Sequence, residues 1–499
     1  MDTQMQFPPE PRYPVQKKEW IFGAALLVCS IFLWNCILYG GFHLGFAIGY
    51  VAVTACSIWY LSACGHRFDL YSGSLLLLSL VIAAGFARSS DGFVKFVMLC
   101  FLLFGSNLSF SLAASQNRRS PGSIGSLLDA PRAFFVLGIG GMGASARGLK
   151  DARENAGAAG KQGSAALLGI LLAAPVMALL VFLLMRADAA FEGLMDLLPE
   201  SDWREPIVSL AVGAFVCWIL FSRGLGLQFS EKKEKQASAF SGIHPITVNI
   251  LMCAVGFVYV VYLLSQLAYF SGGLSGILPE EYTMAQYARR GFFEMAWLSG
   301  INLGLMCFAM GLVEKKEKTP ALTKAACLFL GAVTLFLITT ASAKMFLYIG
   351  SYGLTRLRVL TQVIMIWLAI TTILVSLWLL KPKFAYMKAV ILAAMVLGAA
   401  VLWADVDTQV ARYNVRAYQS GALETIDIYH LRTLGCGATP YIQELTQDSD
   451  PEIAGEAEEC MKYRSVAIED FRDWNWSKAK AEDILAAYQE KEAAEVLPG

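Results

Sequence analysis

Residues 357–404 read LRVLTQVIMIWLAITTILVSLWLLKPKFAYMKAVILAAMVLGAAVLWA, two long apolar runs separated by a short basic turn. An α-helix rises about 1.5 Å per residue, and the hydrocarbon core of a bilayer is about 30 Å thick, so about 20 apolar residues cross it. Both runs reach that length. The stretch therefore predicts two consecutive membrane-spanning helices.

The same test applies to the whole chain of 499 residues, which is 56% hydrophobic and 16% charged. Its mean hydropathy is +0.53, whereas soluble domains carry about 25% charged residues. Helices are expected because unpaired backbone groups in lipid cost several kcal/mol each. The sequence predicts an all-α polytopic transmembrane bundle of eleven spans, at 20–39, 44–61, 70–87, 93–114, 165–185, 207–221, 245–270, 292–313, 321–343, 357–379 and 384–404.

The distribution of Lys and Arg predicts the orientation, because these residues are retained on the cytoplasmic side. With the N-terminus inside, the inner segments hold 22 Lys and Arg residues, and the outer segments before residue 405 hold 9. The opposite orientation would reverse this ratio. An odd number of spans then places residues 405–499, with 19 acidic and 9 basic side chains, outside the cell.

These patterns divide the chain into five predicted parts. They are a cytoplasmic tail (1–19), a four-span membrane unit (20–114), a cytoplasmic Gly/Arg-rich interfacial segment (115–164), a seven-span membrane core (165–404) and an acidic, soluble, helical extracytoplasmic domain (405–499). Residues 133–144 are apolar but too short to cross, so an interfacial or re-entrant piece is expected there, and its entry into the membrane is left open. In the last part, short helices are expected at 409–419, 423–434, 439–446, 451–461 and 477–494.

Cations and aromatic residues gather in two predicted outer segments, YARRGFFEM (287–295) and TASAKMFLYIGSYGLTRLRVLT (340–361), where the charge rule disfavours cations. With the first acidic residue after the last span, they form a candidate outer-face polar cluster of Tyr287, Arg289, Arg290, Glu294, Lys344, Tyr348, Tyr352, Arg356, Arg358 and Asp405. Its cations could receive phosphate or carboxylate headgroups. They could equally pair with carboxylates on the same side, including Glu294, Asp405 and Asp407. The internal network is the favoured interpretation.

Signatures of catalysis, metal binding and cofactor binding are missing from the sequence. The four histidines have no metal-ligand spacing, and no H-E-x-x-H, G-x-S-x-G or Walker pattern occurs. GIGGMG (138–143) matches G-x-G-x-x-G but has no room for a βαβ unit before the next span. We therefore predict no catalytic residue, metal or cofactor, and the acidic tail argues against nucleic acid. A disulfide between Cys436 and Cys460, the two cysteines of the tail, is left open.

The segments YARRGFFEM, YGLTRLRVLT, ARYNVRAYQSGALETIDIYHLRTLGCGATPYIQEL and WNWSKAKAE together resemble a bacterial multi-pass membrane family. That family is domain of unknown function 4173, a relative of the 4153 family, and the resemblance covers residues 170–480. It implies a bacterial plasma-membrane protein with this organisation of spans and tail. The family has no established activity, so the resemblance carries over no catalytic residue.

Three functions remain open at this point. The favoured one is a non-enzymatic envelope component that is embedded in the lipid bilayer. Its outer module, residues 405–499, binds an envelope protein or an anionic lipid headgroup. The second is a transporter or flippase-like carrier, which requires polar residues deep in the membrane. The third is a membrane-embedded transferase for a lipid-linked substrate, with Glu294 or Asp405 as base. The polar residues available to a carrier are Asn35, Asn107, Asn249, Gln266, Asn302 and Gln362.

Overall fold

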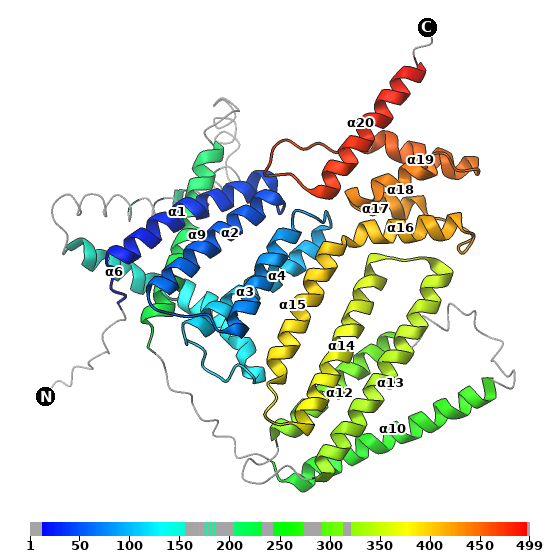
Figure 1. Cartoon of the computed structure of the whole chain (residues 1–499), viewed down its shortest axis with the longest axis horizontal. Coiled ribbons are helices and arrows are strands. Elements are labelled where there is room, and N and C mark those ends of the chain that lie inside the picture. The colour runs from blue at the N-terminus through cyan, green and yellow to red at the C-terminus, as the bar shows by residue number, and fades with distance from the viewer. Residues whose placement is uncertain are drawn as a thin grey trace. The chain divides into compact units, whose positions relative to one another are not determined.

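A computed structural model describes residues 12–154, 204–231, 243–273, 292–312 and 321–496, with a few isolated positions between 169 and 184. Every regular element in these ranges is a helix (Figure 1). Eight of the described helices are long and apolar enough to cross a membrane, and a bent helix pair could add a ninth. The chain is therefore an integral membrane protein, and the all-α prediction is confirmed. The count of eleven spans stays a prediction, because the expected span at 165–185 lies outside the described ranges.

The contacts of the chain divide it into two units that are not continuous in sequence. Unit 1 comprises Met1–Glu234, Gly398–Asp405 and Arg464–Gly499, and unit 2 comprises Lys235–Leu397 and Val406–Tyr463. This division differs from the predicted one, in which residues 405–499 form a single domain. The difference arises because the last part of that segment packs with the N-terminal helices.

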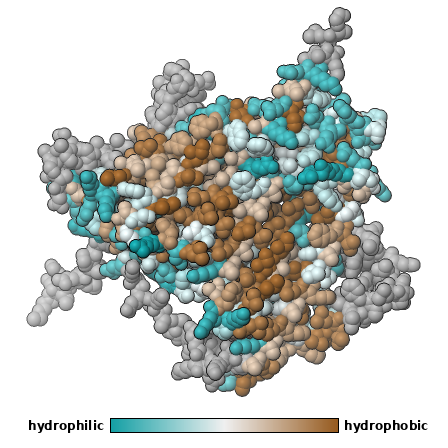
Figure 2. All heavy atoms as spheres, viewed as in Figure 1, coloured by the Kyte–Doolittle hydropathy of each residue, from teal (hydrophilic) through white to brown (hydrophobic). Residues whose placement is uncertain are grey.

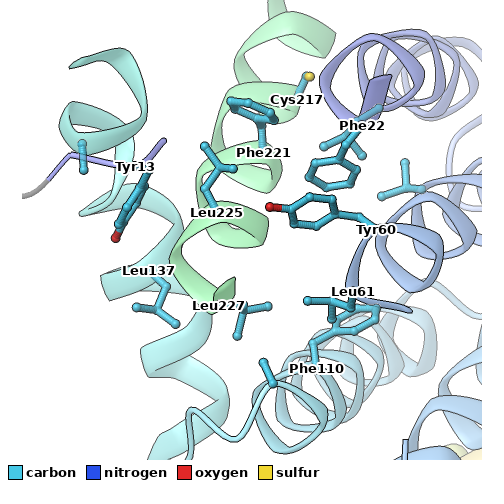
Figure 3. Packing of buried hydrophobic residues seen from close by; sticks show 14 of the residues in the cluster. Tyr13, Phe22, Tyr60, Leu61, Phe110, Leu137, Cys217, Phe221, Leu225 and Leu227 are labelled. Carbon is cyan, nitrogen blue, oxygen red and sulfur yellow. The ribbon is translucent and has the colours of Figure 1, made fainter. Parts of the chain in front are cut away.

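The helices of unit 1 are α1 (Lys17–Asn35), α2 (Leu44–Ala63), α3 (Leu70–Gly85), α4 (Gly92–Ala113), α5 (Asp129–Arg132), α6 (Met142–Glu154), α9 (Arg204–Phe229) and α20 (Trp476–Val496). Its core joins α1, α2 and α9 through aromatic rings (Figure 3). Phe22 stacks on Tyr60 with ring centroids 4.3 Å apart, and the ring centroids of Phe22 and Phe221 are 5.9 Å apart. Small residues let the helices approach closely: a Cβ on Gly213 would lie 2.6 Å from the Cα of Ile31.

The segment between α4 and α6 is helical but broken. It contains a 3-10 helix (Ile124–Leu128), α5 and a π-helix (Ala133–Ile139), and α6 is bent by 43° from the preceding helices. This geometry fits either a broken span or a re-entrant loop, so the predicted re-entrant piece stays a prediction. The glycine pattern at 138–143 follows a helix and not a strand, which removes the basis for a dinucleotide-binding turn.

The helices of unit 2 are α10 (Pro245–Gly273), α12 (Phe292–Leu312), α13 (Ala321–Tyr352), α14 (Arg356–Leu380), α16 (Val406–Gln419), α17 (Ile428–Thr433), α18 (Thr439–Leu445) and α19 (Pro451–Tyr463). A further helix, α15 (Tyr386–Ala404), is divided between the units. Within unit 2, the visible surface over α13 and α14 is mostly apolar, whereas α16–α19 are mostly hydrophilic (Figure 2). The predicted short helices of the tail are confirmed, with boundaries within a few residues. Cys436 and Cys460 are both free thiols.

Candidate functional site

The turn between α13 and α14 connects two candidate membrane spans and is fixed to α16. Gly353 adopts a φ of +73°, which favours glycine, and a Cβ there would lie 2.7 Å from Oδ1 of Asn414. The Asn414 side chain accepts a hydrogen bond from the Leu354 N–H at 2.6 Å and donates one to the Leu354 carbonyl at 2.9 Å. One amide thus satisfies both backbone groups of the turn and holds the tail against it.

A buried ion pair reinforces this junction. Arg356, in the first turn of α14, donates from Nε to Oδ1 of Asp407 and from Nη2 to Oδ2 at 2.9 Å. The Asp407 side chain is fully buried and also accepts the Gly435 N–H at 2.7 Å. Arg356 further donates to the Thr433 carbonyl at 3.0 Å. The pair therefore ties α14, α16 and the end of α17 together.

An open pocket of about 850 Å³ lies between the α13–α14 turn and the loop that joins α16 to α17. The turn contributes Tyr352 and Arg358, and the loop and α17 contribute Glu424, Asp427 and His430. The Arg358 guanidinium lies 4.3 Å from the centroid of the Tyr348 ring. Its Nη1 donates to the carbonyls of Tyr352, at 3.0 Å, and Gly353. Within the described part of the chain, its Nε and Nη2 make no hydrogen bond, so they are available to a ligand.

The opposite wall of the pocket is acidic. Asp427 uses one carboxylate oxygen to accept the His430 N–H at 2.7 Å, which caps the start of α17. Glu424 is exposed and has no ion pair with any described residue. Burial lowers the pKa of His430, and Arg356 and Arg358 lower it further, although Asp427 and Asp407 act against them. His430 is therefore neutral at pH 7, and the pocket combines one cation with two carboxylates.

The structure brings together four of the ten predicted site residues. Tyr348, Tyr352, Arg356 and Arg358 meet at the α13–α14 turn, with Arg356 committed to Asp407. Tyr287, Arg289 and Arg290 lie outside the described residues. Glu294 is exposed in the first turn of α12, and Lys344 lies half-buried along α13.

Asp405, the last predicted site residue, lies in a network of unit 1. It is fully buried with a φ of +52°. Its carboxylate accepts hydrogen bonds from Ser89, at 3.3 Å, and from Ser477. Asn475 donates to the carbonyls of Phe86, at 3.2 Å, and Ser89, at 2.8 Å. Asp405 therefore helps to fix the C-terminal segment to unit 1.

That C-terminal segment, residues 470–477 and here called the docked segment, also caps α2. The Leu44 N–H donates to the Trp474 carbonyl at 3.1 Å, and the Gly45 N–H donates to the Arg472 carbonyl at 3.3 Å. The Trp476 N–H also donates to the carbonyl of Ala87, which follows α3, at 2.8 Å. The first N–H groups of a helix have no partner inside the helix. The docked segment supplies partners for the first two of them, Leu44 and Gly45.

His43 lies between the docked segment and α4. Its Nδ1 is 3.0 Å from Nζ of Lys95, and its Nε2 is 4.0 Å from Oδ1 of Asp473, which also pairs with Lys478. Burial lowers the pKa of His43 to about 4, with further lowering by Lys95 and Lys478 and an opposing effect of Asp473. Neutral His43 accepts the Lys95 hydrogen bond, whereas protonated His43 would repel it.

We expect acidification to loosen the docked segment. Because the pKa of His43 is about 4 in the folded protein and 6.5 in an unfolded chain, the unfolded state binds the proton more readily. The His43 contribution to stability is therefore constant above pH 6.5 and falls as the pH decreases from 6.5 to 4. Hydrogen exchange of residues 470–477 should accelerate over that window. His43→Gln, which cannot be protonated, should flatten the response, and an unchanged response in this variant would contradict the assignment.

Sequence reasoning missed one residue of unit 1, Arg223. The predicted span at 207–221 leaves Arg223 in an inner loop, but α9 continues to Phe229 and the candidate span is Val208–Phe229. Arg223 is 5% exposed and donates to Oδ1 of Asn107 at 3.2 Å and to Oγ of Ser57 at 3.1 Å. Its Cζ lies 5.0 Å from the Phe110 ring centroid. The signal was available, since SRGLGLQF has no helix-ending charge run or proline.

Arg223 has no carboxylate partner among the described residues, and its Nε has no hydrogen bond. Three of the amides proposed for a carrier connect neighbouring elements. Asn302 accepts from Tyr259 at 2.8 Å, Asn249 accepts from Thr323 at 2.5 Å, and Asn35, at the end of α1, accepts from Arg472 at 2.9 Å. Arg223 is therefore the feature that structural packing explains least.

Comparison with known proteins returned one family. A family model described as a domain of unknown function (DUF4153) matches residues 73–445, a range that begins in α3 and ends in α18. No curated protein matches the chain. No solved structure matches it either. The finer resemblance to domain of unknown function 4173 stays a prediction.

Proposed function

We propose that this chain, which belongs to the family of domain of unknown function 4153, has a non-enzymatic role in the bacterial plasma membrane. In this role, the pocket of unit 2 binds the phosphate of a lipid headgroup at the outer face. The observation that carries the proposal is the pocket of about 850 Å³ at the ends of two candidate spans, with Arg358 in its wall. Ligand pockets typically measure about 300–1,000 Å³.

The composition of the turn supports a location at the membrane interface. Tyr348 and Tyr352 lie at the end of α13, and tyrosine is enriched where a span meets the headgroups. The Nε and Nη2 atoms of Arg358 have no hydrogen-bond partner among the described residues, and guanidinium N–H groups bind phosphate oxygens. The outward orientation rests on the distribution of Lys and Arg along the sequence. A reporter fused to the C-terminus that is active outside the cell supports it, and one active only in the cytoplasm contradicts it.

The proposal predicts that Arg358→Gln loses bound phospholipid. A hydrogen bond to a charged group contributes about 1.5–3 kcal/mol, so the affinity should fall by about tenfold or more. Native mass spectrometry of the full-length protein after partial delipidation measures the phospholipids retained. Arg412→Gln is the matched control, because Arg412 is exposed on α16 and outside the pocket. Equal retention by the two variants would contradict the proposal, provided that thermal unfolding confirms both are folded.

A second function, a carrier for an anionic solute, is favoured by Arg223 alone. A charged residue deep in a span costs about 2.5–3.5 kcal/mol on insertion scales and marks functional sites in membrane proteins. Within the ranges that the structure describes, the guanidinium on α9 is paired only with neutral groups, which belong to α2 and α4. The transferase alternative gains no such support from Asp405, because its carboxylate accepts hydrogen bonds from Ser89 and Ser477.

If Arg223 is kept for function, Arg223→Met should fold with an unchanged or higher melting temperature. Replacing a buried charge by an apolar side chain of similar volume is often neutral or stabilising. The groups left behind keep other partners: Ser57 also donates to the Val53 carbonyl at 3.1 Å, and Asn107 to that of Leu103 at 2.7 Å. Arg223→Ala, which leaves a cavity, is the comparison. A melting temperature of the Met variant as low as that of the Ala variant would assign Arg223 a structural role.

A further inference from the structure

We infer that the pocket of unit 2 selects a zwitterionic headgroup in which a phosphate and a primary ammonium are joined by a short linker, as in ethanolamine phospholipids. The inference rests on the proposed function and names its ligand. It follows from three properties of the pocket: the sign of the charge on each wall, the net charge, and the presence of a single aromatic side chain among the described lining residues.

The two walls carry opposite charges on different elements. Arg358 belongs to the first turn of α14, which begins a candidate span. Glu424 and Asp427 belong to the loop between α16 and α17. One oxygen of Asp427 caps α17, and the other accepts no hydrogen bond from a described residue. The pocket can therefore bind a phosphate at the end of the span and an ammonium at the loop.

The net charge of the pocket argues against a purely anionic headgroup. With His430 neutral, one guanidinium faces two carboxylates, so the sum is negative. A headgroup carrying only a phosphate would leave both carboxylates unpaired and would be repelled by them. A zwitterion satisfies both walls without bringing a net charge. For this pocket, a zwitterionic headgroup therefore replaces the anionic headgroup that the cations of the sequence alone suggest.

The chemistry of the acidic wall favours a primary ammonium over a trimethylated one. An –NH₃⁺ group has three donors for carboxylate oxygens, whereas a quaternary ammonium has none and is bound by aromatic cages. Tyr348 is covered by the Arg358 guanidinium, which leaves Tyr352 as the aromatic side chain lining the pocket. A choline headgroup would therefore lack a cage.

The test measures lipid preference of the full-length protein in nanodiscs with equal fractions of phosphatidylethanolamine, phosphatidylglycerol and phosphatidylcholine. Native mass spectrometry of the released complex should show about tenfold preference for the ethanolamine lipid over the other two. The Glu424→Gln/Asp427→Asn double variant should lose this preference while keeping total phospholipid. Asn is as good a helix cap as Asp, so α17 should be retained. Glu452→Gln, an exposed change on α19, is the matched control.

The outcomes separate the inference from the proposal it rests on. Equal or tighter binding of phosphatidylglycerol by the unmodified protein would overturn the zwitterion while leaving a phosphate site. Lipid binding that does not depend on Arg358 would overturn both. Soluble phosphoethanolamine identifies the source of the ligand. If it displaces the lipid at comparable concentration, the site binds a free phosphate ester. If only the lipid competes, the acyl chains contribute to the binding. If neither the ethanolamine lipid nor soluble phosphoethanolamine is preferred over the glycerol and choline headgroups, the inference is overturned.

Discussion

Asp407→Ala is expected to destabilise unit 2 by about 3 kcal/mol or more. Removing one partner of a buried ion pair costs about 3–5 kcal/mol, because the other charge is left without compensation. Here the substitution leaves two donor atoms of Arg356 and the Gly435 N–H without their acceptor. The Arg356 side chain is 34% exposed, so water can recover part of the loss. The cost should therefore lie near the lower end of that range.

Thermal unfolding of the full-length protein in detergent, followed by proteolysis of residues 420–435, measures this effect. Release of α17 from the junction should make that stretch the first to be cleaved. Asp407→Asn should be intermediate, because an amide oxygen still accepts but the charge is lost. Glu444→Ala, an exposed acidic change on α18, is the control. An Asp407→Ala variant that melts with the control would show that the pair contributes nothing measurable.

The membrane helices could be predicted because their signal is local. Residues 357–379 were expected to span, and α14 covers Arg356–Leu380. Hydropathy summed over about 20 residues decides such a case without knowledge of any neighbour. The same method ends the span at residue 221, before the cation Arg223, whereas the candidate span continues to Phe229. A guanidinium inside a bundle is tolerated when Asn, Ser and an aromatic ring surround it, and these partners come from other helices.

The site was predicted in part, for the same reason. Arg358 and the tyrosines lie within one stretch, so their proximity was visible in the sequence. The acidic wall comes from Glu424 and Asp427, which share the pocket with Arg358 because Asn414 and the Arg356–Asp407 pair fix α16 to the turn. Asp405 and Asp407 are two residues apart yet belong to networks in different units. No local pattern assigns such neighbours to separate partners, since the assignment depends on where the chain returns.

Gly40→Ala is expected to release the docked segment from unit 1. A Cβ on Gly40 would lie 2.4 Å from both the carbonyl carbon and the carbonyl oxygen of Arg472. These are backbone atoms, so no rotation of a side chain relieves the overlap. Overpacking of this kind costs about 1–3 kcal/mol. Displacement of Arg472 would also remove the acceptor of the Gly45 N–H, which is worth about 1 kcal/mol. The expected cost is therefore about 2–4 kcal/mol.

Gly73→Ala supplies a control with the opposite expected sign. Gly73 lies in α3 with nothing within 4 Å of an added Cβ, and alanine in a helix is favoured over glycine by about 0.5–1 kcal/mol. Limited proteolysis should therefore cut Gly40→Ala between 464 and 477 while Gly73→Ala resists as well as the parent protein. A second variant keeps the test independent of overall folding. Asn475→Ala removes the hydrogen bonds to Phe86 and Ser89 from the other side of the same contact and should expose the same stretch. An uncleaved Gly40→Ala variant would contradict the expected overlap with Arg472, and cleavage of this variant but not of Asn475→Ala would mean that the hydrogen bonds of Asn475 are not needed to hold the docked segment.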